Sequence, residues 1–144
     1  MKICGNYLSN YEWLANVTAD ENVILCRRSA LMCLSLFSGY MYDDKVEAYC
    51  LEVGNNENIN YHLVNSFDDF EIIQTNTLRF TSATQTFNDM LSDFDNVDEQ
   101  SLIEGLSNYY FDNNQSFAGL SINEKNENLF NQLKEYAIEY YSEG

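Results

Sequence analysis

The sequence predicts an α+β fold: a small central β-sheet of about four antiparallel strands packed with helices, with a helical C-terminal half. Two observations support this. Short segments with loosely alternating polar and apolar residues, separated by turn residues, occupy positions 46–81, and apolar residues recur at helical spacing after position 83. A chain of 144 residues, 45% of them hydrophobic, is the right size for a single domain spanning residues 1–144.

Two helices are expected before the strands. The first covers residues 9–17 and has Ser9 or Asn10 as its N-cap, because a short polar side chain satisfies the first free backbone N–H groups of a helix. The second covers residues 28–38. Gly39 is expected to end it, because glycine adopts the left-handed conformation found after many helices.

The expected strands form two neighbouring pairs. Residues 46–53 and 59–64 are separated by the turn residues at 54–56, so the second strand is expected to pair with the first. Residues 70–74 and 78–81 are expected to form a hairpin.

Three helices follow the strands. Ser82 is placed to cap a helix over residues 83–91, and a second helix is expected over residues 98–111. The clearest helical pattern covers residues 123–141, where the apolar side chains fall within one stripe.

Charge is the most unusual property of the chain. It has 23 acidic and seven basic residues, a formal net charge of −16, and few lysines despite its many asparagines. Asn and Lys both have A/T-rich codons, so the lysine deficit is not explained by base composition. This balance disfavours nucleic acid and anionic membranes as partners and favours a basic protein surface.

No apolar run is long enough to span a bilayer, and residues 1–7 do not resemble a signal peptide, so a cytoplasmic location is expected. Cysteines at positions 4, 26, 33 and 50 form no Cys-x-x-Cys pair, which indicates buried thiols rather than a zinc site. No metal or cofactor is expected.

The sequence also gives little support for catalysis. His62, the only histidine, lies in an expected strand with no recognisable partner for nucleophilic or acid–base chemistry. Residues 93–99 are rich in Asp, but they lack the glycine and one ligand of a calcium loop. Arg27 and Arg28 are the only basic pair, too little for a nucleic-acid footprint. We therefore expect a protein that is not an enzyme.

The acidic residues are concentrated in the helical half, which has a net charge of −10 over residues 80–144 against −6 over residues 1–79. On the last helix the glutamates project from the side opposite the apolar stripe. A solvated face is the simple interpretation, and a surface that steers a basic partner is the functional one. The candidate partner-binding residues are Asp93, Asp95, Asp98, Glu99, Glu104, Glu124, Glu127, Glu135, Glu139 and Glu143.

Four segments of the chain resemble the C-terminal region of AbiEi-type (type IV) antitoxins. They are the Ser-Ala-Leu helix start at 29–31, the expected strand at 46–53, the Thr-Ser-x-x-x-Thr stretch within 78–91, and the last helix around 133–137. Ala83 and Gln85 stand where that family usually has Pro and Arg. The match begins near residue 25, so the family's winged-helix DNA-binding domain is expected to be absent. The resemblance implies a protein that neutralises a nucleotidyltransferase-type toxin.

Together these patterns predict a non-enzymatic acidic inhibitor of bacterial or phage origin. It would bind and block a basic nucleic-acid-handling protein, in the manner of an antitoxin or an anti-CRISPR protein, with nucleic-acid mimicry as one form of the same idea. The basic target would be a nuclease, a CRISPR effector or a nucleotidyltransferase toxin. The alternative is an acidic structural protein that self-associates through its aromatic surface, because the chain has 11 tyrosines. The sequence does not determine the oligomeric state.

Overall fold

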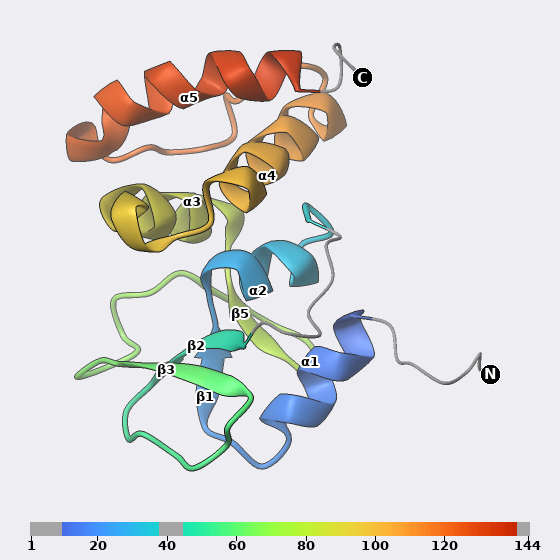
Figure 1. Ribbon diagram of the computed structural model, residues 1–144, viewed down its shortest axis with the longest axis vertical. Coiled ribbons are helices and arrows are strands. Elements are labelled where there is room, and N and C mark those ends of the chain that lie inside the picture. The colour runs from blue at the N-terminus through green and yellow to red at the C-terminus, as the bar shows by residue number, and fades with distance from the viewer. Residues whose placement is uncertain (1–9, 38–44, 141–144) are drawn as a thin grey trace.

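The computed structural model describes residues 10–37 and 45–140, and the fold is α+β as expected. A five-stranded sheet lies at one end of the molecule, and the helices α3, α4 and α5 are stacked at the other, with α2 between them (Figure 1). Candidate residue Glu143 and the expected helix ends at Ser9, Gly39 and Tyr141 lie outside the described residues.

The sheet is mixed, which corrects the expectation of about four antiparallel strands. Its strands are β1 (Val23–Leu25), β2 (Val46–Cys50), β3 (Ile59–Leu63), β4 (Ile72–Gln74) and β5 (Arg79–Thr81), and their order is β3-β2-β1-β5-β4. The β1–β2 and β4–β5 pairs are antiparallel, so the expected hairpin is confirmed. The β1–β5 and β2–β3 pairs are parallel.

The parallel pairing of β2 with β3 has a local cause. The segment 51–58 does not make a tight turn but carries the chain back to the start of β2, so that Val46 lies beside Ile59 and both side chains are buried. Asn56 fixes this crossover, because its Nδ2 donates to the Val17 carbonyl at 3.0 Å and its backbone N–H donates to Tyr61 Oη at 3.2 Å. The turn residues at 54–56 therefore belong to a crossover and not to a hairpin.

The strand β1 was not expected from the sequence. It has only three residues, all buried, and it occupies the centre of the sheet between β2 and β5. A strand that is buried on both faces shows no alternation of polar and apolar residues, so the usual pattern is missing.

The helices agree with the expected order. They are α1 (Asn10–Thr18), α2 (Arg27–Cys33), α3 (Ala83–Ser92), α4 (Glu99–Asp112) and α5 (Glu127–Glu139), with the short 3₁₀ helices η1 (Phe94–Asn96) and η2 (Glu124–Asn126) before α4 and α5. The expected cap is confirmed, since Ser82 Oγ accepts from the Gln85 N–H at 3.1 Å. The helix α2 is shorter than expected, because Ser35 already has a left-handed φ of 62°.

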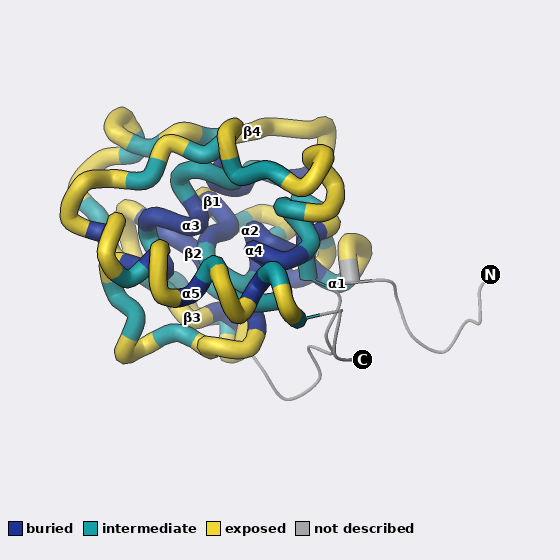
Figure 2. The backbone as a smooth tube through the Cα atoms, turned by 90° about the horizontal axis from the view of Figure 1, so that it is seen from above, coloured by how far each residue is buried: buried dark blue, intermediate teal, exposed yellow. Residues whose placement is uncertain are grey.

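Two hydrophobic clusters meet at α2. Ala30 and Met32 pack with α1 and one face of the sheet, whereas Leu31 packs with α3, α4 and α5. Figure 2 shows the buried segments gathered at the centre, while the outer turns of α5 are exposed. The opposite face of the sheet carries Ile24, Cys26 and Tyr49 and is covered by the segment 64–72.

Within residues 10–37 and 45–140, no helix combines the length and apolar character that crossing a membrane requires.

Candidate functional site

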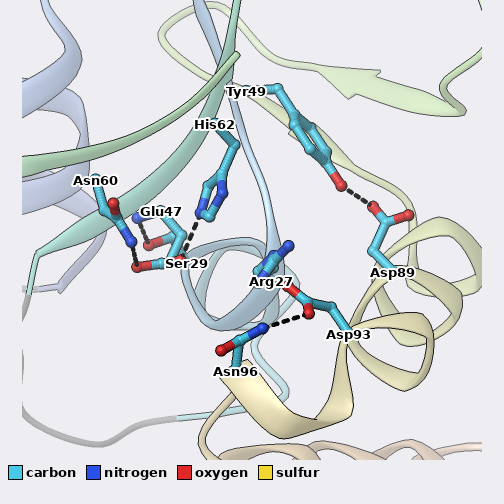
Figure 3. Close-up of polar contacts among 9 residues, drawn as sticks. All are labelled: Arg27, Ser29, Glu47, Tyr49, Asn60, His62, Asp89, Asp93 and Asn96. Carbon is cyan, nitrogen blue, oxygen red and sulfur yellow. Dashed lines mark hydrogen bonds and ion pairs between the residues drawn. The ribbon is translucent and has the colours of Figure 1, made fainter. Parts of the chain in front are cut away.

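A polar cleft of about 450 Å³ lies where β2 and β3 approach the start of α2 and the helix η1 (Figure 3). Its volume is within the range of small-molecule sites. The lining residues are Arg27, Arg28, Glu47, Asn60, His62, Met90, Asp93, Asn96, Val97 and Asp98.

The sheet supplies one wall of this cleft. In the parallel register Glu47 lies beside Asn60 and Tyr49 lies beside His62. Side chains two residues apart on a strand share a face, so these four polar side chains project from the same side of the sheet. The residues between them, such as Ala48 and Tyr61, face the hydrophobic cluster on the other side.

Glu47 and His62 form a close pair on this wall. The Nε2 atom of His62 lies 2.8 Å from Glu47 Oε1, and Asn60 Nδ2 donates to Glu47 Oε2 at 3.1 Å. Burial alone would raise the pKa of Glu47, but the hydrogen bonds from His62 and Asn60 hold the pKa below its ordinary value. An ionised carboxylate only accepts hydrogen bonds, so Nε2 of His62 carries a proton.

The helix α2 and the segment after α3 supply the opposite wall. Arg27 Nη1 lies 2.9 Å from Asp93 Oδ2, and Arg28 Nη1 lies 3.9 Å from Asp98 Oδ2. Hydrogen bonds from Asn96 and Arg27 lower the pKa of Asp93. Figure 3 shows Arg27 between the Glu47–His62 pair and Asp93, so groups from the sheet and from the helical half meet at this side chain.

Arg27 also has an unusual backbone. Its φ is 51°, in the left-handed region that costs a non-glycine residue on the order of 1–2 kcal/mol. Its Nε atom is buried and has no hydrogen-bond partner among the described residues. Strained residues often lie at functional sites, so the geometry makes Arg27 a residue of interest.

A second polar contact joins the strand β2 to the helix α3. Tyr49 Oη donates to Asp89 Oδ2 at 2.8 Å, and Gln85 Nε2 donates to Asp89 Oδ1 at 2.9 Å. Burial raises the pKa of Asp89, and the hydrogen bonds from Tyr49 and Gln85 oppose this only in part. This contact supports the position of α3 and does not line the cleft.

The candidate acidic residues fall into three groups. Asp93, Asp98 and Glu104 contact other side chains: Asp93 and Asp98 pair with the two arginines, and Glu104 Oε1 accepts from Tyr140 Oη at 3.1 Å. Asp95 and Glu99 are exposed near η1 and the start of α4. Glu124, Glu127, Glu135 and Glu139 are exposed along η2 and α5. The fold therefore does not gather all the candidates at one place.

The cleft was not predicted from the sequence. Arg27 and Arg28 are only a weak nucleic-acid signal there, and His62 has no recognisable partner, because Glu47 and Asp93 are distant from them in the chain. The only usable signal was that the single histidine and most of the arginines of a strongly acidic chain were not yet accounted for.

Among the described residues, no group of three or more His, Cys, Asp or Glu side chains is arranged to hold a metal ion. A comparison with models of known protein families gives no match, and a comparison with curated proteins gives none either.

Proposed function

We propose that this chain is a non-enzymatic acidic protein that binds a basic, nucleic-acid-handling protein through the outer face of α5 and blocks it. The observation that carries the proposal is the separation of two faces on this helix. Phe130, Leu133 and Ala137 are buried against the rest of the molecule, whereas Glu127, Glu135 and Glu139 are exposed.

The exposed face has properties that suit a basic partner. Glu135 and Glu139 are one turn apart, which places their Cβ atoms about 5–6 Å from each other, a spacing comparable with that of phosphates. The only lysine of α5, Lys134, is partly buried, with its Nζ 5.8 Å from the centre of the Phe130 ring. The part of the outer face of α5 that carries Glu135 and Glu139 therefore has no lysine or arginine between these two residues.

Tyr136 adds a contact of a different kind. Its side chain is 63% exposed, and it lies three residues before Glu139, a spacing that makes the two neighbours on the helix surface. Tyrosine is enriched among the residues that dominate protein–protein binding energy, because it provides a large, fairly rigid contact area with one polar end. An exposed tyrosine within an acidic face favours a protein partner over simple solvation.

The partner is proposed by its chemistry. A nuclease, a CRISPR effector or a nucleotidyltransferase toxin presents a basic groove for nucleic acid, and an acidic helix that covers such a groove acts as an inhibitor. The resemblance of segments within residues 25–140 to AbiEi-type antitoxins favours the toxin within this group. A cytoplasmic location and a bacterial or phage origin belong to the same proposal.

The test compares two double charge reversals of equal size. Glu135→Lys/Glu139→Lys changes the proposed face, and Glu52→Lys/Glu57→Lys changes exposed residues in the crossover between β2 and β3. A partner captured from a bacterial host is titrated with each variant at low and high salt, and its nucleic-acid binding is measured in parallel. We expect the first variant to lose affinity by at least about tenfold, or ~1.4 kcal/mol, and the second to lose much less.

Three results would contradict the proposal. Equal losses for both variants would mean that only net charge matters and that α5 is not the binding face. Affinity that does not fall with salt would exclude an electrostatic interaction, because exposed charges are screened within about 8–10 Å at physiological salt. A partner that keeps its nucleic-acid binding in the complex would exclude inhibition by blocking.

Self-association remains a second candidate because of one apolar region. Leu51, Val53 and Leu63 are 43%, 56% and 64% exposed. Leu51 directly follows β2, Val53 lies in the crossover after it, and Leu63 ends β3, which is an edge strand. Exposed apolar edges tend to pair with other chains. Sedimentation of the pure protein distinguishes the candidates, since a stable oligomer that dissociates on Leu63→Lys substitution favours self-association.

A further inference from the structure

The polar cleft has features that the proposed binding of a partner to the outer face of α5 does not explain. The chain has only seven Lys and Arg residues and one His, yet two of its three arginines and its histidine line one cleft of about 450 Å³. They come from two segments, residues 27–28 in α2 and residue 62 in β3, which only the fold brings together. In a chain with a net charge of −16, two guanidinium groups and the single imidazole in one cleft form an unusual grouping, even beside the carboxylates of Asp93, Asp98 and Glu47.

We propose that the cleft binds a small molecule through a phosphate group, held by the guanidinium groups of Arg27 and Arg28 with His62 as a further polar contact. Arginine is suited to this because its forked N–H donors match the oxygens of a phosphate. A tetrahedral phosphate accepts hydrogen bonds from several directions, whereas a carboxylate is planar and is satisfied by a single guanidinium. Polar groups that approach from two separate elements, α2 and β3, therefore favour phosphate.

Arg27 keeps donor capacity for such a ligand. Its ion pair with Asp93 is made through Nη1, a guanidinium has further N–H donors, and the buried Nε has no hydrogen-bond partner among the described residues. The side chain is only 13% exposed, so an unused donor here has little access to water. The left-handed backbone of Arg27 also lowers the stability of the fold, and strained residues of this kind are common at functional sites.

Acidic side chains in the cleft compete with a phosphate for the same donors but do not exclude it. Asp98 is 48% exposed and lies 3.9 Å from Arg28, beyond hydrogen-bond distance, so a phosphate can replace it. Glu47 accepts from Nε2 of His62 and thereby orients the ring, and the described residues provide no hydrogen bond to Nδ1. Nδ1 is therefore the ring nitrogen of His62 that remains for a polar contact with the ligand.

The rest of the ligand has room beyond the phosphate. Asn60 and Asn96 contribute amide groups to the lining, and Met90 and Val97 contribute apolar surface. A phosphorylated small molecule with both polar and apolar parts fits this lining better than a free ion does. This site is separate from the outer face of α5, so its ligand and the proposed protein partner are tested independently.

The single histidine gives a direct readout. One imidazole Cε1–H resonance is expected in the NMR spectrum, and it reports on a group that lines the cleft. Inorganic phosphate is titrated into the full chain at constant ionic strength, with sodium acetate and sodium chloride in parallel titrations. We expect a saturable change with phosphate, an affinity for acetate that is weaker by about tenfold or more, and no saturation with chloride.

Two variants move the affinity in opposite directions. Arg27→Gln removes a guanidinium and is expected to weaken phosphate binding at least about tenfold. Asp98→Asn removes a competing carboxylate and is expected to strengthen binding several-fold. Lys125→Gln is the control, because it removes one positive charge from an exposed residue of η2 that does not line the cleft, and its affinity should stay within about twofold of the original.

The proposal is overturned by any of four results. These are the absence of a saturable phosphate response, equal affinity for acetate, unchanged binding by Arg27→Gln, and weaker binding by Asp98→Asn. The last would show that the cleft prefers cations. Because Asp98 is half exposed, its variant keeps the test decisive if Arg27→Gln does not fold.

Discussion

The Nη1 atom of Arg27 lies 2.9 Å from the Oδ2 atom of Asp93, and this ion pair joins the first residue of α2 to the C-cap residue of α3. The arginine side chain is 13% exposed and the carboxylate 38%. Because the guanidinium is mostly buried, loss of its partner leaves a poorly solvated charge.

Asp93→Ala is therefore expected to lower the free energy of unfolding by about 1–2 kcal/mol, between the values for exposed pairs and for buried charged hydrogen bonds. Urea denaturation measures this change. Asp95→Ala is the matched control, because it removes an exposed carboxylate two residues further along the chain, and it is expected to change stability by less than about 0.5 kcal/mol. Equal effects of the two substitutions would mean that the pair contributes nothing.

The Glu47–His62 pair predicts a pH dependence of stability. The pKa of Glu47 is lower in the folded chain than its ordinary value of 4.5, so its ionisation stabilises the fold above that pH. This contribution is lost as the pH falls through the lowered pKa. Glu47→Gln should be destabilised relative to the original chain at about pH 7, and the difference should shrink towards about pH 3.

The ionisation of Asp89 has the opposite effect on the pH dependence of stability, so its contribution has to be separated from that of Glu47. Burial raises its pKa, so it favours the fold at acid pH and loses this contribution as the pH rises through the raised pKa. Unfolding free energies of Glu47→Gln and of Glu57→Gln, an exposed control, are compared across the same pH range. A constant difference between the original chain and Glu47→Gln would contradict a lowered pKa.

Gly105 predicts a packing effect inside α4. A Cβ atom at this position would lie 3.0 Å from Leu31 Cδ1 and 3.3 Å from Phe87 Cε1, and both of these side chains are fully buried. Alanine favours a helix by about 1 kcal/mol over glycine, but overpacking costs about 1–3 kcal/mol.

Gly105→Ala is accordingly expected to destabilise the protein by about 1–2 kcal/mol, as measured by thermal or urea unfolding. Leu102→Ala in the same helix creates a cavity instead and should cost about 2–5 kcal/mol. A stabilised Gly105→Ala variant would show that Leu31 and Phe87 move aside at little cost.

Asn88 connects α3 to the segment that leads into α5. Its Nδ2 donates to the carbonyls of Thr84 and Ser121, at 3.0 and 2.9 Å, and its Oδ1 accepts from the Asn123 N–H at 2.8 Å. The side chain is almost entirely buried, so Asn88→Ala removes these partners of the Ser121 carbonyl and the Asn123 N–H and should cost about 2–3 kcal/mol.

Hydrogen exchange distinguishes a local effect from a general one. Relative to the original chain, Asn88→Ala should accelerate exchange of the amides at the start of α5 more than exchange of the amides of β2. The reason is that the lost hydrogen bonds hold the segment before α5. Asn128→Ala is the control, since Asn128 is exposed on α5. Uniform acceleration in α5 and β2 would mean that the whole fold is weakened and that Asn88 has no local role.

The sequence was sufficient for the elements that show a clear period. The helices around residues 83–91 and 98–111 and the hairpin of β4 with β5 were predicted because each follows its own pattern of apolar residues. The strand β1 was missed because its three residues are all buried and do not alternate. The parallel pairing of β2 and β3 was missed because turn residues indicate that the chain changes direction. They do not show whether the next strand runs back along β2 or whether the chain first returns to the start of β2.

The polar cleft is harder to predict than any single element. Arg27, Glu47, His62 and Asp93 are separated in the chain by other elements, and only the positions of α2, the sheet and η1 bring them together. Asp93 was predicted to bind a partner, yet its carboxylate already pairs with Arg27. The charge of a residue is visible in the sequence, but whether that charge is already neutralised depends on the fold.

The position of α2 limits how this protein can be cut into smaller pieces. Leu31 is fully buried among the C-terminal helices, and its neighbours Ala30 and Met32 are buried against the sheet. A fragment that begins at α3 would keep every exposed glutamate of α5 but would lose Leu31 and expose apolar surface in its place. We expect such a fragment to aggregate or stay unfolded, so a miniaturised version of the acidic helices needs a redesigned inner surface.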